Sequence, residues 1–295
     1  MRKTLKDNFY YRKIRSQTNT PKLWINKFPW KKKNDHKYSR GRVVVYGGEK
    51  HMVGATILSS ESALRVGTGS VKIICDKKNI VIYSSKFPSL LKVEINNFNS
   101  LKKFLEREKI TSMLIGPGAG SSRKTKKIVK MILSKVKNVV LDADALTCFK
   151  TKPKELYALL DKNKIITPHL KEFHSIFPNI SKKEDPIKKV LEATKLTKSN
   201  VLLKGSKTIL GSYDKKIIIN SHSSPELATI GSGDVLSGIL VSLIGEKKMN
   251  PFLAGCSAVW LHGDIAKNYG KGLIAEDIVK GIPQALKRLE KWKIY

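Results

Sequence analysis

The sequence contains few cysteines and no long apolar run. Its three cysteines, Cys75, Cys148 and Cys256, are widely separated among 295 residues and show no metal-ligand pairing. Each lies in an apolar or mixed stretch typical of a buried thiol. No stretch reaches the roughly 18 uninterrupted apolar residues of a membrane-spanning helix, and the basic N-terminus lacks the apolar core of a secretory signal. We therefore expect a soluble protein of the reducing cytoplasm, with no membrane partner.

Acidic residues are also scarce, at 24 Asp and Glu against 57 Lys and Arg, which gives a formal net charge of +33. Such a charge is compatible with a nucleic-acid or anionic-membrane partner. However, the lysines are spread along the whole chain, mostly on the polar side of apolar periodicity, and the best basic patch is the short run at residues 30–33. We interpret the charge as solvated surface, with no specific nucleic-acid partner.

The chain divides into two parts that differ in composition and in apolar periodicity. Residues 1–35 are polar, basic and aperiodic and predict a basic N-terminal arm, whereas residues 36–295 show no interior linker and predict one domain. Within this domain, β-branched runs too apolar for half-solvated strands predict a mostly parallel sheet buried on both faces. These runs occupy residues 43–45, 71–74, 113–115, 139–141, 165–166, 201–203 and 217–219.

Helical patterns alternate with these strands at residues 55–66, 125–136 and 186–196, as in a doubly wound α/β protein. The final third reads as three consecutive helices. The first begins near Gly233; the second has Asn250 as N-cap and Pro251 at its first position, and runs to Gly270. The third covers residues 275–292, where Pro283 can introduce a kink. The predicted fold class is α/β, with a central sheet flanked by helices.

The segment at residues 228–238 is the most informative for chemistry. Gly231, Ser232 and Gly233 run directly into an amphipathic helix, so that backbone N–H groups and the helix dipole suit a phosphate or a developing oxyanion. Asp234 follows in the first helical turn. A carboxylate there is either an ordinary helix-start residue or the base that takes a proton from a substrate hydroxyl, and the glycine context favours the base.

Other strand ends carry further candidates. Lys204, Gly205, Ser206, Lys207 and Thr208 follow a buried strand and suit a nucleotide's phosphates or ribose, although a plain surface turn is equally compatible. The glycine-rich residues 116–120 follow another strand, and ligands of open parallel sheets bind at such ends. Asp142 and Asp144 suit Mg²⁺ or a structural tie between loops. His169 suits a substrate contact or a structural hydrogen bond.

Several common active-site motifs are missing. No Gly-x-Ser-x-Gly elbow and no phosphate-binding lysine loop of the Walker type occur. The Gly-Thr-Gly-Ser run at residues 67–70 precedes a strand instead of following one, which argues against a dinucleotide-binding Rossmann unit.

Taken in order, the motifs closely resemble those of the NAD(P)H-hydrate dehydratases, repair enzymes of the ribokinase-like superfamily. The resemblance covers nearly everything after residue 35, and the ordered combination is more specific than any single motif. It rests on residues 36–41, 47–48, 54–55, 63–69, 116–118, 141–146, 167–169 with Glu172, 204–205, 228–238 and 261–263.

This resemblance implies a three-layer ribokinase-like fold and a lyase reaction. A nucleoside phosphate phosphorylates the hydroxyl of the S-epimer of hydrated NADH or NADPH, and elimination of phosphate then restores the cofactor. Bacterial members use ADP and release AMP, whereas eukaryotic members use ATP; the motif set favours ADP here, with Mg²⁺. By the same resemblance, Ala55, Gly118, Gly120, His169 and Asp234 would contact the hydrated dinucleotide, with Asp234 as the base. The adenine nucleotide would be held by Lys204, Gly205, Ser206, Lys207, Thr208, Gly231, Ser232 and Gly233.

Two departures from the family pattern stand out. Ile230 occupies a position where many members have glycine, and Ser224-Pro225-Glu226-Leu227 replaces a more common Asn-Pro-Gly stretch. Many bacterial members are fused to an epimerase that acts on the same metabolite, and members are often homo-oligomers; we expect a separate or fused epimerase and a homo-oligomer here. The alternative enzyme is a ribokinase-like vitamin-precursor kinase, which would share the Gly-x-Gly-Asp turn. A basic nucleic-acid-binding protein is a more distant alternative.

Overall fold

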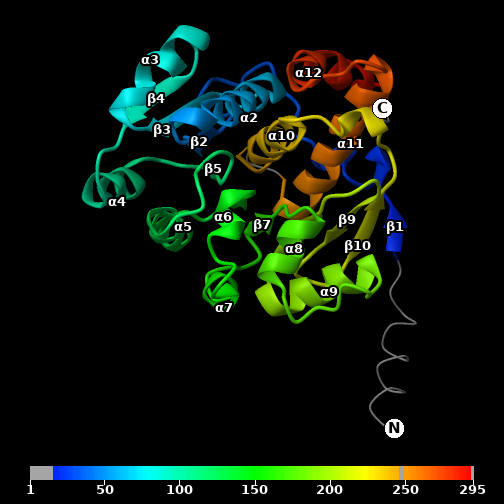
Figure 1. The fold of residues 1–295 in the computed structure, drawn as a ribbon. Helices are drawn as coiled ribbons and strands as arrows, with labels where there is room; N and C mark the ends of the chain where they lie inside the picture. The colour runs from blue at the N-terminus through cyan, green and yellow to red at the C-terminus, as the bar shows by residue number, and fades with distance from the viewer. Residues whose placement is uncertain (1–15, 246–248, 294–295) are drawn as a thin grey trace.

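A computed structural model describes residues 16–245 and 249–293. Its strands all belong to one sheet (Figure 1). They are β1 (Ser16–Thr18), β2 (Arg42–Tyr46), β3 (Ser70–Cys75), β4 (Leu91–Glu94), β5 (Ser112–Ile115), β6 (Val139–Leu141), β7 (Lys164–Ile166), β8 (Asn200–Leu203), β9 (Thr208–Gly211) and β10 (Ile217–Asn220).

The strand order is β1-β10-β9-β8-β7-β6-β5-β2-β3-β4. The pairs from β8 across to β4 are parallel, whereas β9 is antiparallel to both of its neighbours, and β1 pairs in parallel with β10 at the edge. The carboxyl ends of the central parallel strands therefore lie along one edge of the sheet, where ligands of such sheets bind.

Helices connect most of the strands. The α-helices are α2 (Val53–Val66), α3 (Lys77–Lys86), α4 (Phe98–Arg107), α5 (Arg123–Lys135), α6 (Asp144–Thr147), α7 (Pro153–Tyr157), α8 (Leu170–Ile176), α9 (Pro186–Thr197), α10 (Ser232–Gly245), α11 (Pro251–Tyr269) and α12 (Ala275–Glu290). Short 3-10 turns are η1 (Pro21–Leu23), η2 (Ile25–Lys27), η3 (Lys50–Met52) and η4 (Pro225–Leu227). No helix within the described ranges is long and apolar enough to cross a membrane.

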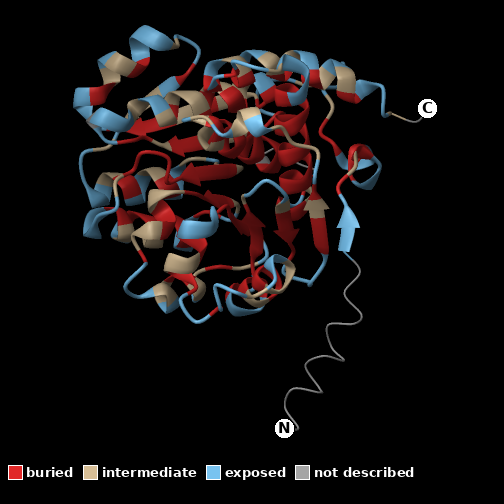
Figure 2. Cartoon of the chain, turned by 45° about the vertical axis from the view of Figure 1, so that its right-hand side comes forward, coloured by how far each residue is buried: buried red, intermediate tan, exposed pale blue. Residues whose placement is uncertain are grey.

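Two hydrophobic cores cover the two faces of the sheet. One core contains buried side chains of α2, α10, α11 and α12, and the other contains those of α4, α5, α8 and α9. Alternate residues of one strand serve opposite faces: Val43 and Val45 belong to the first core and Val44 to the second. Figure 2 shows the sheet as a buried layer between outer helices. The predicted three-layer α/β architecture is confirmed.

Every strand predicted from an apolar run is present, and so are the three predicted interior helices and the three C-terminal ones. Asn250 is the N-cap of α11, where its side chain accepts from Leu253 N, and Gly270 follows the last turn. Pro283 lies inside α12. The strands β1, β4 and β9 were not among those predicted from the sequence.

Residues 16–30, which the sequence analysis assigned to the N-terminal arm, pack on the rest of the fold. Asn19 Nδ2 donates to Asn220 Oδ1 at 2.8 Å and to the Cys256 carbonyl at 2.7 Å, and Trp24 Nε1 donates to Asn19 Oδ1 at 3.1 Å. Trp24 is 1% exposed and meets Trp260 edge-on at 6.1 Å. The division of the chain at residue 35 stays a prediction, but this part of the arm contributes to the core.

Candidate active site

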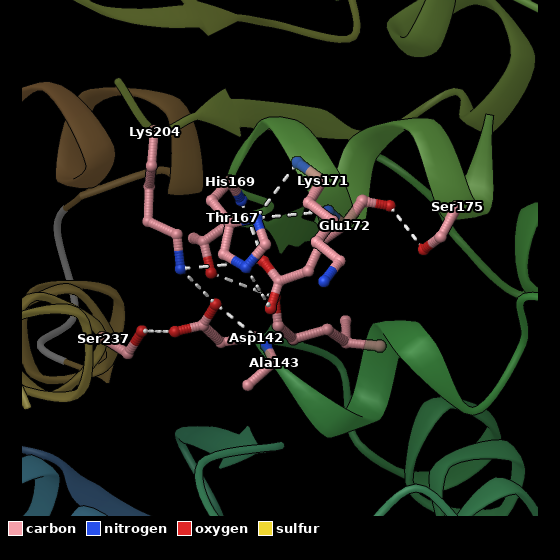
Figure 3. A network of polar contacts seen from close by, with 10 residues as sticks. Asp142, Ala143, Thr167, His169, Lys171, Glu172, Ser175, Lys204 and Ser237 are labelled. Atoms are coloured by element: carbon pink, nitrogen blue, oxygen red, sulfur yellow. Dashed lines mark hydrogen bonds and ion pairs between the residues drawn. The ribbon is translucent and has the colours of Figure 1, made fainter. Parts of the chain in front are cut away.

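A buried ion pair lies at the carboxyl ends of the central strands. Asp142 directly follows β6 and Lys204 directly follows β8. Lys204 Nζ donates to Asp142 Oδ1 at 2.7 Å, and Ser237 Oγ of α10 donates to Asp142 Oδ2 at 2.7 Å. The N–H of Ala143 adds a third hydrogen bond to Oδ1, at 2.9 Å. Asp142 is 2% exposed, and these donors compensate the burial of its charge (Figure 3).

The backbone at the end of β6 adopts an unusual conformation that presents Asp142 to these donors. Ala143 has a φ of 45°, which is uncommon for a residue with a side chain and is found mainly where surrounding structure holds it. Gly116, after β5, has a φ of 132°, and a Cβ there would lie 1.7 Å from the carbonyl oxygen of Asp142. Only glycine fits at this position, because any side chain would displace the Asp142 backbone.

Asp234 lies in the first turn of α10, on the side of the ion pair. Burial, followed by the negative charge of Asp142, raises the pKa of Asp234 to about 7; Lys204 opposes the shift and Asp144 adds to it. A carboxyl group with this pKa is present as both acid and carboxylate near neutral pH, so it can accept a proton and release it again.

The turn that enters α10 is shaped by Gly231 and held by His262. Gly231 has a φ of 84°. His262 Nε2 lies 3.1 Å from Ser232 Oγ and 3.0 Å from the Ser232 carbonyl. Burial lowers the pKa of His262 to about 4, so the ring is neutral at physiological pH. A Cβ built at Gly233 would lie 3.7 Å from Lys204 Nζ, which places the predicted anion-binding turn beside the one cation of the ion pair.

His169 begins α8 and faces the same edge of the sheet. Its Nδ1 accepts from the N–H groups of Lys171 and Glu172 at 3.1 and 3.2 Å, so Nε2 carries the proton of the neutral ring. Glu172 Oε2 accepts from His169 N at 2.8 Å and lies 4.0 Å from Lys204 Nζ. The His169 side chain is half exposed, so its Nε2–H can reach a bound molecule.

The Lys204 ammonium group is charged. Burial lowers the pKa of Lys204, but Asp142 and Glu172 together raise it and keep the group protonated.

The predicted substrate contacts Ala55, Gly118 and Gly120 lie on the other side of Asp142. Gly118 packs on Met52, the residue that precedes α2, and Ala55 is in the first turn of that helix. Gly120 N donates to Asp144 Oδ2 at 2.9 Å. Asp144 therefore ties the turn after β5 to the end of β6, and its possible role toward Mg²⁺ stays a prediction.

The remaining predicted nucleotide residues do not contact this cluster. Gly205, Ser206 and Lys207 form the exposed turn between β8 and β9, and Thr208 Oγ1 donates to the Gly205 carbonyl at 3.3 Å. The turn is open to solvent and adjoins Lys204, so it is accessible to a ligand. Its predicted contact with a nucleotide stays a prediction.

Two residues that organise the site were not among the predicted site residues. Ser237 anchors Asp142 to α10, and His262 anchors Ser232 to α11. The sequence does not indicate which residues these two side chains contact. Ser237 lies 95 residues from Asp142, and His262 lies 30 residues from Ser232. Within residues 16–245 and 249–293, no group of three or more His, Cys, Asp or Glu is placed to hold a metal ion.

Comparison with solved structures defines the class of fold as ribokinase-like. A ribokinase-like superfamily protein from Enterococcus faecalis matches with a TM-score of 0.82 at 22% identity, covering 93% of this chain and 96% of that one. The ADP/ATP-dependent NAD(P)H-hydrate dehydratase from Bacillus subtilis matches with a TM-score of 0.78 at 23% identity, covering 93% and 99%.

Sequence comparison narrows this class to one family. A family model described as NAD(P)H-hydrate dehydratase matches residues 43–284. The chain is 30% identical over 271 residues to the ADP-dependent (S)-NAD(P)H-hydrate dehydratase of Staphylococcus aureus, covering 89% of this chain and 94% of that protein. This protein belongs to the NAD(P)H-hydrate dehydratase family.

Some relatives are longer. The bifunctional NAD(P)H-hydrate repair enzyme of Dictyoglomus turgidum is 32% identical over 278 residues, and the match covers 86% of this chain but 52% of that enzyme. The chain thus spans about half the length of the bifunctional relatives that it matches.

Proposed function

We propose that this protein is an ADP-dependent (S)-NAD(P)H-hydrate dehydratase, a lyase that restores NADH or NADPH from the hydrated cofactor. The hydroxyl of the hydrated nicotinamide ring attacks the terminal phosphoryl group of ADP, AMP leaves, and elimination of phosphate then re-forms the ring double bond. The observation that carries this proposal is Asp234, whose pKa is raised to about 7 and which directly follows Gly233, where a Cβ would lie 3.7 Å from Lys204 Nζ.

The site supports a division of labour between its two sides. Asp234 accepts the proton of the ring hydroxyl as that oxygen attacks phosphorus. Lys204 and the N–H groups of Gly231 to Gly233 stabilise the negative charge of the transferred phosphoryl group. Gly118 and Ala55 on the β5 side and His169 after β7 position the hydrated dinucleotide, and Gly205 to Thr208 hold the adenine nucleotide after β8.

Phosphate oxygens of the bound nucleotide would supply most of the ligands of a Mg²⁺ ion. Both oxygens of Asp142 already accept from Lys204 and Ser237, and one oxygen of Asp144 accepts from Gly120 N. This donor set fits a cation held by phosphate oxygens and water with at most one or two carboxylates. When bound, the ion would neutralise charge on the transferred phosphate. The name of the Bacillus subtilis enzyme includes both ADP and ATP, and it was co-crystallised with ATP and Mg²⁺; the Staphylococcus aureus relative is named as ADP-dependent. We take ADP as the donor.

A separate or fused epimerase that acts on the same metabolite remains the expected functional partner, because the bifunctional relatives carry about as much additional chain as this match covers. We also retain the homo-oligomer as an expectation. A vitamin-precursor kinase is the alternative; a hydroxyethylthiazole kinase from Pyrococcus horikoshii shares the fold at a TM-score of 0.61 but only 13% identity.

Recovery of absorbance at the reduced-nicotinamide band tests the function. Purified protein is mixed with hydrated NADH or hydrated NADPH, Mg²⁺ and either ADP or ATP. We expect recovery with ADP and its loss in Asp234→Asn. Recovery with ATP alone would overturn the choice of donor, and no recovery from folded protein would favour the vitamin-precursor kinase.

A further inference from the structure

The loop that leads into the glycine turn contains little that would fix its own conformation. This loop, which we call the β10–α10 loop, covers residues 221–231 and includes η4. None of its residues is buried, and Leu227 packs on the hydrophobic core but is only partly covered. Burial of apolar side chains therefore offsets little of the entropy that is lost when the loop is ordered. Its position depends on specific contacts at its two ends.

Both ends of the β10–α10 loop lie on α11. Next to α10, His262 contacts Ser232, as the structure of the glycine turn requires. At the other end, His222 lies on a second set of α11 residues, which are spaced i, i+3, i+4 and i+7 and therefore share one face of the helix. They are Trp260, Gly263, Asp264 and Lys267.

The backbone of His222 is fixed from two sides. Its carbonyl accepts from Asn220 Nδ2 at 3.0 Å, and Asn220 is itself 2% exposed and accepts from Asn19. A Cβ built at Gly263 would lie 1.8 Å from the same carbonyl oxygen. Only glycine at residue 263 allows the His222 backbone to lie this close to the helix.

The side chain of His222 is oriented by a stacked ring and by a carboxylate. The imidazole lies flat on Trp260, with ring centroids 4.7 Å apart and ring planes at 10°. Its Nε2 lies 3.5 Å from Asp264 Oδ1. Arg288 Nε and Nη2 lie 2.8 and 2.7 Å from Asp264 Oδ2, so α12 holds this carboxylate in place. The ring is thus held by contacts that have no part in the proposed chemistry.

We propose that His222 is a positioning residue for the phosphate donor, an inference that rests on the proposed function. It acts through the β10–α10 loop: with both ends held on α11, the N–H groups of Gly231 to Gly233 are in place before ADP binds. Donors that are ordered in advance bind a phosphate more tightly, because binding then does not have to order them. Without the His222 contacts, part of the loop would be ordered only when ADP binds.

Variants at the His222 end of the loop test the proposal. His222→Ala removes the ring, and Gly263→Ala displaces the His222 carbonyl while leaving the ring in place. We expect each to raise both the Kd and the KM for ADP about tenfold and to leave KM for hydrated NADH unchanged. His222→Phe keeps the stack on Trp260 and should recover most of the affinity for ADP.

The matched control is His36→Ala. His36 also holds a short loop, through Nδ1 and the N–H groups of Tyr38 and Ser39, but this loop precedes β2 and is remote in sequence from the glycine turn. We expect His36→Ala to leave both the Kd and the KM for ADP unchanged. Titration calorimetry with ADP measures Kd without turnover, and initial rates measure KM.

A merely structural role for His222 predicts a different result. His222→Ala and Gly263→Ala would then lower the temperature of unfolding but leave the Kd and KM for ADP at their wild-type values, which would overturn the proposal. A rise in KM for hydrated NADH in place of ADP would overturn it as well.

The calorimetric measurement separates this proposal from the proposed function. If the wild type binds ADP but does not restore hydrated NADH, the proposed function fails, and the Kd values of the variants still decide whether His222 positions the turn. If the wild type does not bind ADP, both proposals fail.

Discussion

The charges of two other carboxylates and one ammonium group act on the Asp234 carboxyl group, and together with burial they set its pKa. Burial is the main cause of its raised pKa; Asp142 and Asp144 raise the pKa further, whereas Lys204 lowers it. A base that binds its proton too weakly cannot drive attack by a hydroxyl, and one that binds it too strongly is blocked near neutral pH. The arrangement therefore tunes one carboxyl group for proton transfer at pH 7.

The first prediction concerns the stability of Asp234→Asn. The pKa of Asp234 is higher in the folded protein than in the unfolded chain, so the folded state binds the extra proton and the wild type loses stability as pH rises from about 4 to about 7. Asparagine lacks this titration. We expect the variant to have little effect on the free energy of unfolding at pH 4 and to raise it by on the order of 3 kcal/mol at pH 8. Urea unfolding at both pH values measures the difference; equal effects at both would contradict it.

The second prediction concerns Lys204→Met. Removal of the ammonium group leaves Asp142 buried without its counter-ion, which costs about 3 kcal/mol of stability. It also removes the charge that lowers the pKa of Asp234, so the acidic limb of kcat/KM moves from near pH 7 to higher pH. The pH dependence of the residual activity measures this shift. Lys207→Met removes an exposed lysine three residues away and should leave the limb in place.

At the level of elements, the first turn of α10 is held by His262 of α11, a residue that is not among the proposed substrate contacts. Our third prediction is that His262→Leu leaves the Ser232 carbonyl and hydroxyl without their partner, lowers the free energy of unfolding by about 2 kcal/mol and raises KM for ADP. His262→Gln keeps a side-chain N–H and should recover most of both losses. Thermal unfolding and initial rates measure the two effects; a variant with leucine and normal KM would show that α10 holds the turn unaided.

The fourth prediction concerns Trp24, in the segment that follows the edge strand β1. Trp24 is buried between η1 and α11, so Trp24→Ala should lower the free energy of unfolding by about 4 kcal/mol. Trp292→Ala, at a position 38% exposed, should cost far less. Chemical denaturation compares the two. An equal loss would show that burial against Trp260 does not decide the contribution of Trp24.

Elements with a strong local pattern were predictable and the others were not. The fully apolar strands such as β5 and β6 stand out in the sequence because both of their faces are buried. By contrast, β4 is a four-residue edge strand in which apolar and charged residues alternate and no residue is fully buried. The strand β1 is a three-residue polar segment whose pairing decides its conformation. In the site, the Gly-x-Gly-Asp turn was enough to predict Asp234 from the sequence. The pairing of Lys204 with Asp142 was not predictable in this way, because it joins residues 62 apart and depends on the order of the strands.

At the scale of the whole molecule, a net charge of +33 surrounds a site that receives two anionic substrates. The fifth prediction is that kcat/KM for both substrates falls several-fold between about 0.05 and 0.5 M salt, because screening weakens the attraction of anions to a cationic protein. The kcat at saturating substrate should change little. Steady-state kinetics in a salt series measures this, and a salt-independent kcat/KM would mean that the surface lysines do not affect substrate encounter.

The pairing of β1 with β10 also has a consequence for synthesis. Asn19 and Asn220, which continue this pairing, are 201 residues apart. At the usual speed of translation, about 5–20 residues per second, the first strand leaves the ribosome roughly 10–40 s before its neighbour has been made. The strand β1 is therefore among the last elements to find its place, and the sheet edge that it covers can close only after residue 220 has emerged.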